Sequence, residues 1–248
     1  MKNLFDMTGK VVLVTGGSRG LGRAMVQGFA EAGAHVAIVS RKLDACEKAA
    51  REVEKLGVRA FPYACHVAHW DELEPMVDGV YEHFGRVDVL INNAGMSPLY
   101  PSLVEVTEDL FDKVIGVNFK GPFRLSALVG DRMVRGDGGS IINISSSGAL
   151  RPNPTIAPYA AAKAALNTLT TSFSQAYSPK VRVNCISVGP FYTDASKGWA
   201  GDPDEAQPDR PMGRIAKPPE IVTTVLYLAS DYTSYTTDAL IRVDGGLR

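Results

Sequence analysis

The stretch that decides the fold is residues 10–33, which read KVVLVTGGSRGLGRAMVQGFAEAG. Its apolar beginning, residues 11–14, is rich in valine and is typical of a short strand that is buried on both faces. Glycines follow at positions 16, 17, 20 and 22, and residues 23–32 then repeat small and apolar side chains at helical spacing. The stretch therefore predicts a strand, a glycine-rich turn and a helix, in that order.

This order suits a bound phosphate. The N-terminus of a helix has unpaired N–H groups and the positive end of the helix dipole, so it attracts an anion. Glycine in the turn lets the backbone approach a pyrophosphate because no Cβ stands in the way. The spacing is Gly16-x3-Gly20-x-Gly22 rather than G-x-G-x-x-G. An ordinary tight turn of an α/β protein is the alternative, but the position between the first strand and helix favours dinucleotide binding.

The composition limits the class of protein. The chain has 248 residues, of which 45% are hydrophobic, which is enough for one sizeable core. A net charge of -1 does not favour binding to nucleic acid or to an anionic membrane. We find no signal-peptide pattern, and no apolar run reaches the roughly 18 residues of a membrane span. The cysteines, Cys46, Cys65 and Cys185, form no C-x-x-C pair. Neither disulfides nor a metal site are therefore indicated, and a cytoplasmic location is expected.

A second apolar run, residues 35–40, ends at Ser40 and Arg41. An acidic residue near this point would hold the ribose hydroxyls of NAD. A carboxylate would repel a 2′-phosphate, whereas an arginine can bind one through two hydrogen bonds. Arg41, together with Arg19 in the glycine turn, therefore favours NADP(H), with NAD(H) as the alternative. Arg41 could instead cap the strand or pair with a surface carboxylate.

Short apolar runs alternate with amphipathic stretches along the rest of the chain. Further strands are expected at residues 58–63, 87–91, 141–144, 181–187 and 239–243. Helices are expected at residues 43–56, 70–84 and 159–177, from Thr107 (as the cap) through Asn118, and at residues 218–229. This alternation predicts an α/β fold, a single-domain doubly wound parallel sheet of about seven strands with helices on both faces (a Rossmann fold), over residues 1–248. Residues 194–214 are long for a connection in such a fold and are expected to form a substrate lid.

Tyr159 and Lys163 are four positions apart in a predicted helix, so they lie on one face. A lysine ammonium beside a phenol favours the phenolate, so we expect the pKa of Tyr159 to fall. Such a tyrosine can exchange a proton with a carbonyl oxygen. Ser146 follows the preceding strand, and its hydroxyl can hydrogen-bond the same oxygen. The pair alone is a weak signal, because this spacing also occurs by chance on helix surfaces.

The complete set resembles the short-chain dehydrogenase/reductase family over nearly the whole chain, in its 3-oxoacyl-thioester reductase and general carbonyl reductase branch. The matching motifs are Thr15-Gly16-x3-Gly20-x-Gly22, Asn92-Asn93-Ala94-Gly95, Asn118, Ser146 and Tyr159-x3-Lys163. The resemblance implies that Tyr159 is the general acid/base, that Lys163 lowers its pKa and holds the nicotinamide ribose, and that Ser146 orients the substrate. It also implies a helix distortion at Asn118, which would hold a water of a proton relay.

The resemblance also implies a set of cofactor contacts. Asn92 is expected near the adenine ribose, and Thr193 near the nicotinamide carboxamide. The full set is Gly16, Ser18, Arg19, Gly20, Leu21, Ser40, Arg41, His66, Val67, Asn92, Ala94, Gly95, Tyr159, Lys163, Gly189 and Thr193. Three positions depart from the family pattern, which usually has an aspartate at His66, Pro-Gly where Val188-Gly189-Pro190 stands, and a glycine at Asp238.

The expected activity is hydride transfer between NADP(H) and a small-molecule carbonyl or secondary alcohol, in a homotetramer. An NAD-linked alcohol dehydrogenase of the same fold and a non-catalytic dinucleotide-binding sensor are the alternatives. The substrate walls are expected from residues 96–100, 149–156 and 191–214. These offer apolar contacts from Leu150, Tyr192, Trp199 and Met212, and anion contacts from Arg151, Lys197 and Arg210. The sequence does not identify the substrate, because loops diverge freely on one fold.

Overall fold

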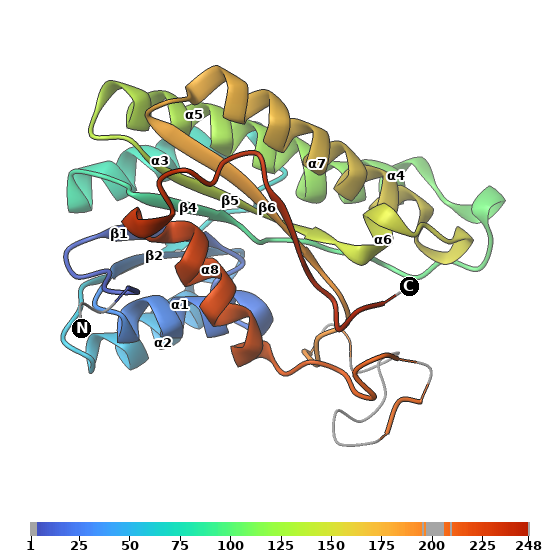
Figure 1. The fold of residues 1–248 in the computed structure, drawn as a ribbon. Coiled ribbons are helices and arrows are strands. Elements are labelled where there is room, and N and C mark those ends of the chain that lie inside the picture. The colour runs from blue at the N-terminus through green and yellow to red at the C-terminus, as the bar shows by residue number, and fades with distance from the viewer. Residues whose placement is uncertain (1–3, 195, 197–205, 209, 248) are drawn as a thin grey trace.

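The computed structural model describes residues 4–194, 196, 206–208 and 210–247. Its strands form one parallel, seven-stranded sheet in the order β3-β2-β1-β4-β5-β6-β7 (Figure 1). The strands are β1 (Val11–Thr15), β2 (His35–Ser40), β3 (Ala60–Ala64), β4 (Val89–Asn92), β5 (Gly139–Ser146), β6 (Val181–Val188) and β7 (Leu240–Val243). The predicted α/β class and parallel Rossmann-type sheet are confirmed.

Helices cover both faces of the sheet (Figure 1). One face carries α1 (Gly20–Glu31), α2 (Leu43–Glu54) and α8 (Val222–Ala229), and the other carries α3 (Trp70–Phe84), α5 (Gly121–Arg135) and α7 (Ala157–Tyr177). Shorter helices are α4 (Glu108–Ile115) and α6 (Ser147–Leu150). A π-helical turn (Gly116–Lys120) joins α4 to α5, and 3-10 turns span Leu103–Glu105, Pro154–Ile156, Pro218–Ile221 and Asp231–Thr233.

Strand β1 shows why the sheet is buried on both sides. Successive strand residues point to opposite faces. Val12 and Val14 therefore join the core under α1 and α8, whereas Leu13 joins the core under α3 and α5. All three are fully buried, and burying one such side chain stabilises the fold by roughly 1.5–3 kcal/mol. The all-apolar run at the start of the chain is thus the central strand of a two-sided core.

Several element boundaries differ from the sequence-based prediction, among them those of β4 and β5. The fourth strand begins at Val89 rather than at residue 87, and just before it the Asp88 carboxylate accepts the N–H of Val11 at 2.8 Å and is held by Arg86. The fifth strand runs on to Ser146, because β6 pairs with it as far as Val188. The longer β5 places Ser146 at the end of the ladder, at the edge of the sheet where ligands bind in this class of fold.

The last helix packs on the first. Val222, at the start of α8, lies so close to Gly28 of α1 that a Cβ at position 28 would stand 2.3 Å from Val222 Cγ1. Val225 and Leu228 of α8 continue into the same core as Val26 and Phe29 of α1. The C-terminal helix therefore closes the core of the N-terminal strands. Among the described residues, no helix has the length and apolar character needed to cross a membrane.

Most of the predicted lid cannot be compared with the structure. Of residues 194–214, positions 195, 197–205 and 209 lie outside the described residues, and Lys197 and Trp199 are among them. In the described part, Phe191 forms a bridge with Ala216, and Tyr192 N–H donates to the Ala216 carbonyl at 2.9 Å. Residues 191–192, which follow β6, thus lie beside Ala216, which comes after the predicted lid in the chain.

Candidate active site

The glycine turn follows β1 and leads directly into α1. Gly16 and Gly20 have φ of 66° and 57°, the left-handed region that favours glycine, and Gly16 N–H donates to Val39 O at 2.7 Å. Arg19 precedes the helix and makes no side-chain capping hydrogen bond. The first N–H groups of α1, from Gly20 and Leu21 onward, therefore lack a side-chain cap, as a phosphate-binding helix end requires.

The end of β4 is tied to the end of β1 by Thr15 and Asn93. Thr15 Oγ1 accepts the N–H groups of Asn93 and Ala94 at 3.0 and 3.1 Å, and Asn93 Nδ2 donates to the Thr15 carbonyl at 2.8 Å. These contacts hold the predicted cofactor residues Ala94 and Gly95 against the glycine turn. Asn93, in the NNAG motif at the end of β4, thus helps to brace the central sheet.

The side chain of Asn92 points away from the expected cofactor crevice. It is 1% exposed, and its Nδ2 donates to Ser126 Oγ and to Asn143 Oδ1, both at 2.9 Å. Asn143 in turn donates to Thr170 Oγ1 at 3.0 Å, so a buried polar chain links β4, β5, α5 and α7. The network thus occupies Asn92 Nδ2, while Asn92 Oδ1 is buried and has no hydrogen-bond partner among the described residues.

Asn118 lies in the π-helical turn, where a helix distortion was expected. It is fully buried, and its Nδ2 donates to Val114 O at 2.9 Å and to Met96 O at 2.8 Å. A Cβ at Gly95 would stand 3.1 Å from Asn118 Oδ1 and 3.7 Å from Lys163 Nζ. The structure therefore brings Asn118, Gly95 and Lys163 together, from three separate segments of the chain.

Ser146 and Tyr159 also meet. Ser146 ends β5 and caps the short helix α6, with its Oγ accepting Gly148 N–H at 3.1 Å. A Cβ at Gly148 would stand 3.3 Å from Ser146 Oγ and 3.9 Å from Tyr159 Cε1. The serine is therefore fixed by the strand end, and the tyrosine reaches it from the first turn of α7.

Lys163 lies one helical turn below Tyr159 and is 2% exposed. Its Nζ donates to the Ile144 carbonyl at 2.7 Å and lies 5.9 Å from the centroid of the Tyr159 ring. Burial lowers the pKa of Lys163 to about 8. The ammonium group thus sits between the end of β5 and the tyrosine, close to losing its charge near neutral pH.

The expected fall of the Tyr159 pKa is wrong for this structure. Burial raises the pKa of the Tyr159 phenol, and a hydrogen bond with Ser146 opposes that rise only in part. The physical reason is that desolvation disfavours the phenolate, while the ammonium of Lys163 is engaged with the Ile144 carbonyl. The tyrosine is therefore a neutral proton donor in this state.

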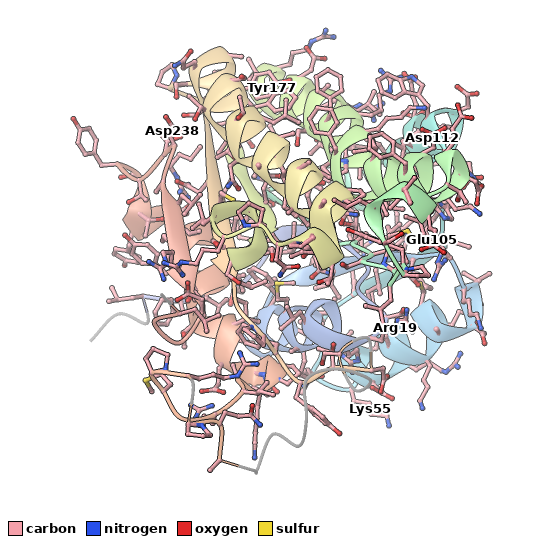
Figure 2. The ribbon with its side chains drawn as sticks, turned by 90° about the vertical axis from the view of Figure 1, so that its right-hand side faces the viewer. Arg19, Lys55, Glu105, Asp112, Tyr177 and Asp238 are labelled. Atoms are coloured by element: carbon pink, nitrogen blue, oxygen red, sulfur yellow. The ribbon has the colours of Figure 1, made fainter. Side chains whose placement is uncertain are left out.

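Arg19 lies in the glycine turn, and Arg41 follows β2. Arg19 and Arg41 are exposed, and neither forms an ion pair with any described residue; Figure 2 shows Arg19 on the outside of the molecule. Between them, Ser40 Oγ donates to Ser18 Oγ at 2.9 Å and contacts Cys46 Sγ at 3.0 Å. The hydroxyls join the turn to the end of β2, which leaves both guanidinium groups free for an anion.

His66 and Val67 follow β3 as the sequence places them. The His66 ring stacks on His69 at 4.5 Å between centroids, and its Nδ1 accepts Ala68 N–H at 3.3 Å. Burial, His69 and Arg41 together lower the pKa of His66. A neutral imidazole therefore stands at the position of the family's usual aspartate, while the Val67 side chain is buried and offers a cofactor only its backbone.

Gly189 and Thr193 lie beyond β6. Gly189 N–H donates to Val243 O at 3.0 Å, and Thr193 N–H donates to Oγ of the buried Ser196 at 2.8 Å. Thr193 approaches Gly20, since a Cβ there would stand 3.4 Å from Thr193 Cγ2. Ser196 was not predicted, because a single serine in this segment matches no motif. The Thr193 segment thus meets the glycine turn.

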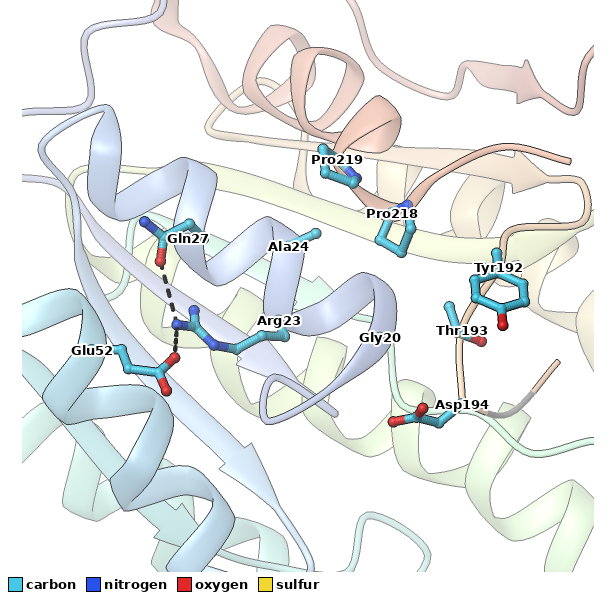
Figure 3. Close-up of a pocket in the computed structure, with 10 residues that line it drawn as sticks. All are labelled: Gly20, Arg23, Ala24, Gln27, Glu52, Tyr192, Thr193, Asp194, Pro218 and Pro219. Carbon is cyan, nitrogen blue, oxygen red and sulfur yellow. Dashed lines mark hydrogen bonds and ion pairs between the residues drawn. The ribbon is translucent and has the colours of Figure 1, made fainter. Parts of the chain in front are cut away.

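A cavity of about 520 Å³ opens where these segments meet (Figure 3). Arg23 projects from α1 along one side and is neutralised by Glu52 of α2 at 2.5 Å. The lining residues are Gly20, Arg23, Ala24, Gln27, Glu52, Tyr192, Thr193, Asp194, Pro218 and Pro219. Two predicted cofactor contacts, Gly20 and Thr193, are among them, whereas Tyr159, Lys163 and Ser146 lie outside this cavity.

Among the described residues that were expected to line the substrate site, one arginine is bonded within the protein and two apolar side chains are exposed. Arg151 donates to the Leu247 carbonyl, to which Arg242 also donates, so Arg151 is engaged with the C-terminal segment. Leu150 and Met212 are 43% and 61% exposed and remain available for apolar contacts. The predicted anion contact through Arg151 is therefore less favourable than the sequence suggested.

Asp238 explains one departure from the family pattern. Its φ is 57°, the left-handed region in which glycine is favoured and aspartate is tolerated. Thr171 Oγ1 donates to Asp238 Oδ1 at 2.7 Å, and Asp238 N–H donates to Val183 O at 2.8 Å. A hydrogen bond from α7, 67 residues away in the chain, thus holds the Asp238 side chain at this left-handed position.

The parallel sheet, the glycine turn after β1 and the Ser146–Tyr159–Lys163 cluster define a Rossmann-type α/β protein whose polar side chains gather at the end of β5 and the start of α7. The family model of the short chain dehydrogenases matches residues 10–204. The chain is 35% identical over 243 residues to the 3-oxoacyl-[acyl-carrier-protein] reductase FabG of Thermotoga maritima, covering 97% of this chain and 98% of that protein. The chain belongs to the short-chain dehydrogenase/reductase family.

Solved structures agree with this assignment. A blue fluorescent protein from a metagenomic library, solved in complex with NADPH, superposes with a TM-score of 0.90 at 31% identity, covering 98% of this chain and 99% of that one. The NADPH-dependent 3-quinuclidinone reductase of Rhodotorula rubra gives a TM-score of 0.90 at 29% identity, covering 98% and 93%. The fold of these two proteins is thus shared along almost the whole chain.

Proposed function

We propose that this chain is an NADP(H)-dependent oxidoreductase that interconverts a ketone and a secondary alcohol. The observation that carries the proposal is the convergence of Ser146, Tyr159 and Lys163 at the end of β5 and the start of α7. The nicotinamide, when bound, supplies or takes up the hydride. The family membership and the uncapped N-terminus of α1 after the glycine turn support a dinucleotide at this edge of the sheet.

Each residue of the cluster has a distinct proposed role. Ser146 Oγ holds the substrate carbonyl oxygen, and Tyr159 Oη donates the proton to that oxygen during reduction or takes it back during oxidation. Lys163 would hold the nicotinamide ribose, and its charge stabilises the tyrosinate as the proton leaves. Asn118 would hold a relay water; its place in the π-helical turn and its approach to Gly95, which also lies close to Lys163, support that placement.

The residues present fit the 2′-phosphate of NADP(H). Arg19 and Arg41 are exposed and unpaired within the described chain, and the Ser18–Ser40 hydroxyl pair lies at the same end of the turn. A dianionic phosphate binds well between guanidinium groups because each can donate two hydrogen bonds. The two NADPH-linked solved structures are consistent with this preference.

The substitution Arg41→Ala is expected to weaken NADPH binding by about 10- to 100-fold, because hydrogen bonds to a charged group contribute about 1.5–3 kcal/mol. NADH affinity should stay the same, since NADH lacks the 2′-phosphate. The measurement is a fluorescence titration with each cofactor. Arg51→Ala is the matched control, because Arg51 is exposed on α2 and pairs with Glu47. An NADPH affinity that does not change in Arg41→Ala would contradict the assignment.

The pH dependence of reduction is expected to follow Lys163. Its folded pKa is lowered to about 8, so the ammonium is present below that pH and is lost above it. The kcat/KM for carbonyl reduction should therefore fall as pH rises through about 8, while the raised pKa of Tyr159 keeps the phenol protonated there. In Lys163→Arg, any residual activity should keep its rate to higher pH. A wild-type profile that stays flat through this range would exclude the role.

A panel of ketones and alcohols, assayed separately with NADPH, NADH and their oxidised forms, tests the function as a whole. Turnover with NADPH that is lost in Tyr159→Phe supports the proposal. Turnover restricted to NAD and alcohols would favour the NAD-linked alcohol dehydrogenase. Tight NADPH binding without turnover of any substrate in the panel would favour a non-catalytic sensor.

A further inference from the structure

The loop after β4 is held at both ends by side-chain hydrogen bonds. At its start, Met96 N–H donates to Asn118 Oδ1 at 3.3 Å, and Met96 O accepts from Asn118 Nδ2 at 2.8 Å. At its end, the Tyr100 hydroxyl donates to Pro154 O at 2.6 Å and accepts Ala157 N–H at 2.7 Å. The loop therefore connects the π-helical turn of Asn118 to the beginning of α7.

The N-cap residue of helix α7 provides no side-chain hydrogen bond to the first turn of the helix. Ile156 stands at the N-cap position and makes no side-chain hydrogen bond, and Pro158 has no N–H to satisfy. The N–H of Ala157 would otherwise be one of the unpaired donors of a helix end. Tyr100, 57 residues earlier in the chain, supplies the missing acceptor. The start of the helix that carries Tyr159 is therefore defined by a hydroxyl from another loop.

The same hydroxyl fixes the segment that precedes the helix. The Tyr100 hydroxyl donates a hydrogen bond to the carbonyl of Pro154, in the 3-10 turn Pro154–Ile156, and accepts one from the N–H of Ala157. One oxygen atom therefore spans the junction between the 3-10 turn and α7. Tyr159 follows Ala157 by two residues, so a displacement of this junction moves Tyr159 directly.

We propose that Tyr100 is a positioning residue for Tyr159, holding the first turn of α7 so that the phenol meets Ser146. The inference rests on the proposed function. Ser146 is fixed independently, by the β5 ladder and by its bond from Gly148 N–H. Loss of the Tyr100 hydroxyl would therefore shift one partner of the Ser146–Tyr159 contact and leave the other in place.

The test is Tyr100→Phe, which removes only the hydroxyl. We expect kcat for carbonyl reduction to fall by about 10- to 100-fold, because small misplacements of a catalytic group have effects of this size. NADPH affinity should not change. The pKa of the Tyr159 phenol, followed by tyrosinate absorbance with Tyr159→Phe as the blank, should rise, because the hydrogen bond with Ser146 lowers that pKa and would be weakened. Tyr235→Phe is the matched control, since Tyr235 is fully exposed.

A second readout does not depend on activity. Hydrogen exchange of the first turn of α7 should accelerate in Tyr100→Phe, and exchange at the C-terminal end of the same helix should not. An unchanged kcat together with an unchanged Tyr159 pKa, or exchange that does not change in the first turn, would overturn the inference. A fall in kcat with no shift of the Tyr159 pKa and faster exchange throughout α7 would also overturn it, since that describes general destabilisation. Wild-type protein that binds NADPH and reduces no carbonyl would instead refute the proposed function.

Discussion

Tyr159→Phe is expected to reduce carbonyl turnover by about 10²–10⁴-fold, because it removes the proposed general acid while keeping the ring. Burial already raises the pKa of this phenol, so at neutral pH the hydroxyl is protonated and ready to donate to a carbonyl oxygen. Ser146 and Lys163 cannot replace it, since the serine is a much weaker acid and the lysine bonds to the Ile144 carbonyl. The measurement is steady-state reduction with NADPH, followed by cofactor absorbance.

The control for this variant is Tyr177→Phe. Tyr177 ends the same helix, and its hydroxyl makes a single long hydrogen bond, 3.4 Å, to Ala127 O. Its loss should leave turnover unaffected, and NADPH affinity should remain that of the wild type in both variants. If Tyr159→Phe retained near-normal turnover, another group would have to supply the proton and the proposed mechanism would be wrong.

Gly22→Ala is expected to lower the free energy of unfolding by about 3 kcal/mol or more, near the upper end of typical overpacking effects. A Cβ at position 22 would stand 2.1 Å from the Gly16 carbonyl oxygen and 2.6 Å from Asn93 Nδ2. Neither neighbour can retreat easily, because Gly16 N–H is bonded to Val39 O and Asn93 Nδ2 to the Thr15 carbonyl. The glycine turn must therefore open, and NADPH affinity should fall with it.

Denaturant unfolding and an NADPH titration measure the two effects. Gly79→Ala is the matched control, because Gly79 lies inside α3 and a Cβ there would meet only ordinary contacts, the nearest at 3.5 Å from Tyr63. Alanine in a helix interior should stabilise the protein by roughly 0.5–1 kcal/mol relative to glycine. Equal stability of Gly22→Ala and the wild type would show that the turn tolerates a side chain, contrary to the close packing described.

Much of the sheet and of the site position could be predicted because local sequence determines them. Helix α3 was predicted with its correct bounds, since its apolar side chains follow helical spacing and Gly85 stops it in the left-handed conformation. Strand β2 was also predicted at its observed bounds. The convergence of Ser146 and Tyr159 follows from a strand end and the next long helix, which parallel topology brings to one edge.

Features that depend on tertiary packing could not be predicted in the same way. The inward side chain of Asn92 follows from strand alternation, because it shares a face with Leu90, but only the structure reveals its partners Ser126 and Asn143. The raised pKa of Tyr159 follows from desolvation, which a spacing pattern does not report. Tyr100 gave no local signal, because its partners lie more than 50 residues along the chain.

The packing of α8 on α1 affects when the chain can finish folding during its synthesis. Strands β1 and β2 are synthesised within the first 40 residues, yet the core that they share with α8 also contains Val222, Val225 and Leu228 of that late helix. A chain growing on the ribosome therefore exposes an apolar face of its oldest part until nearly all of it has been synthesised. We expect folding to finish late and to depend on long-range contacts, with the unfinished chain a target for chaperones.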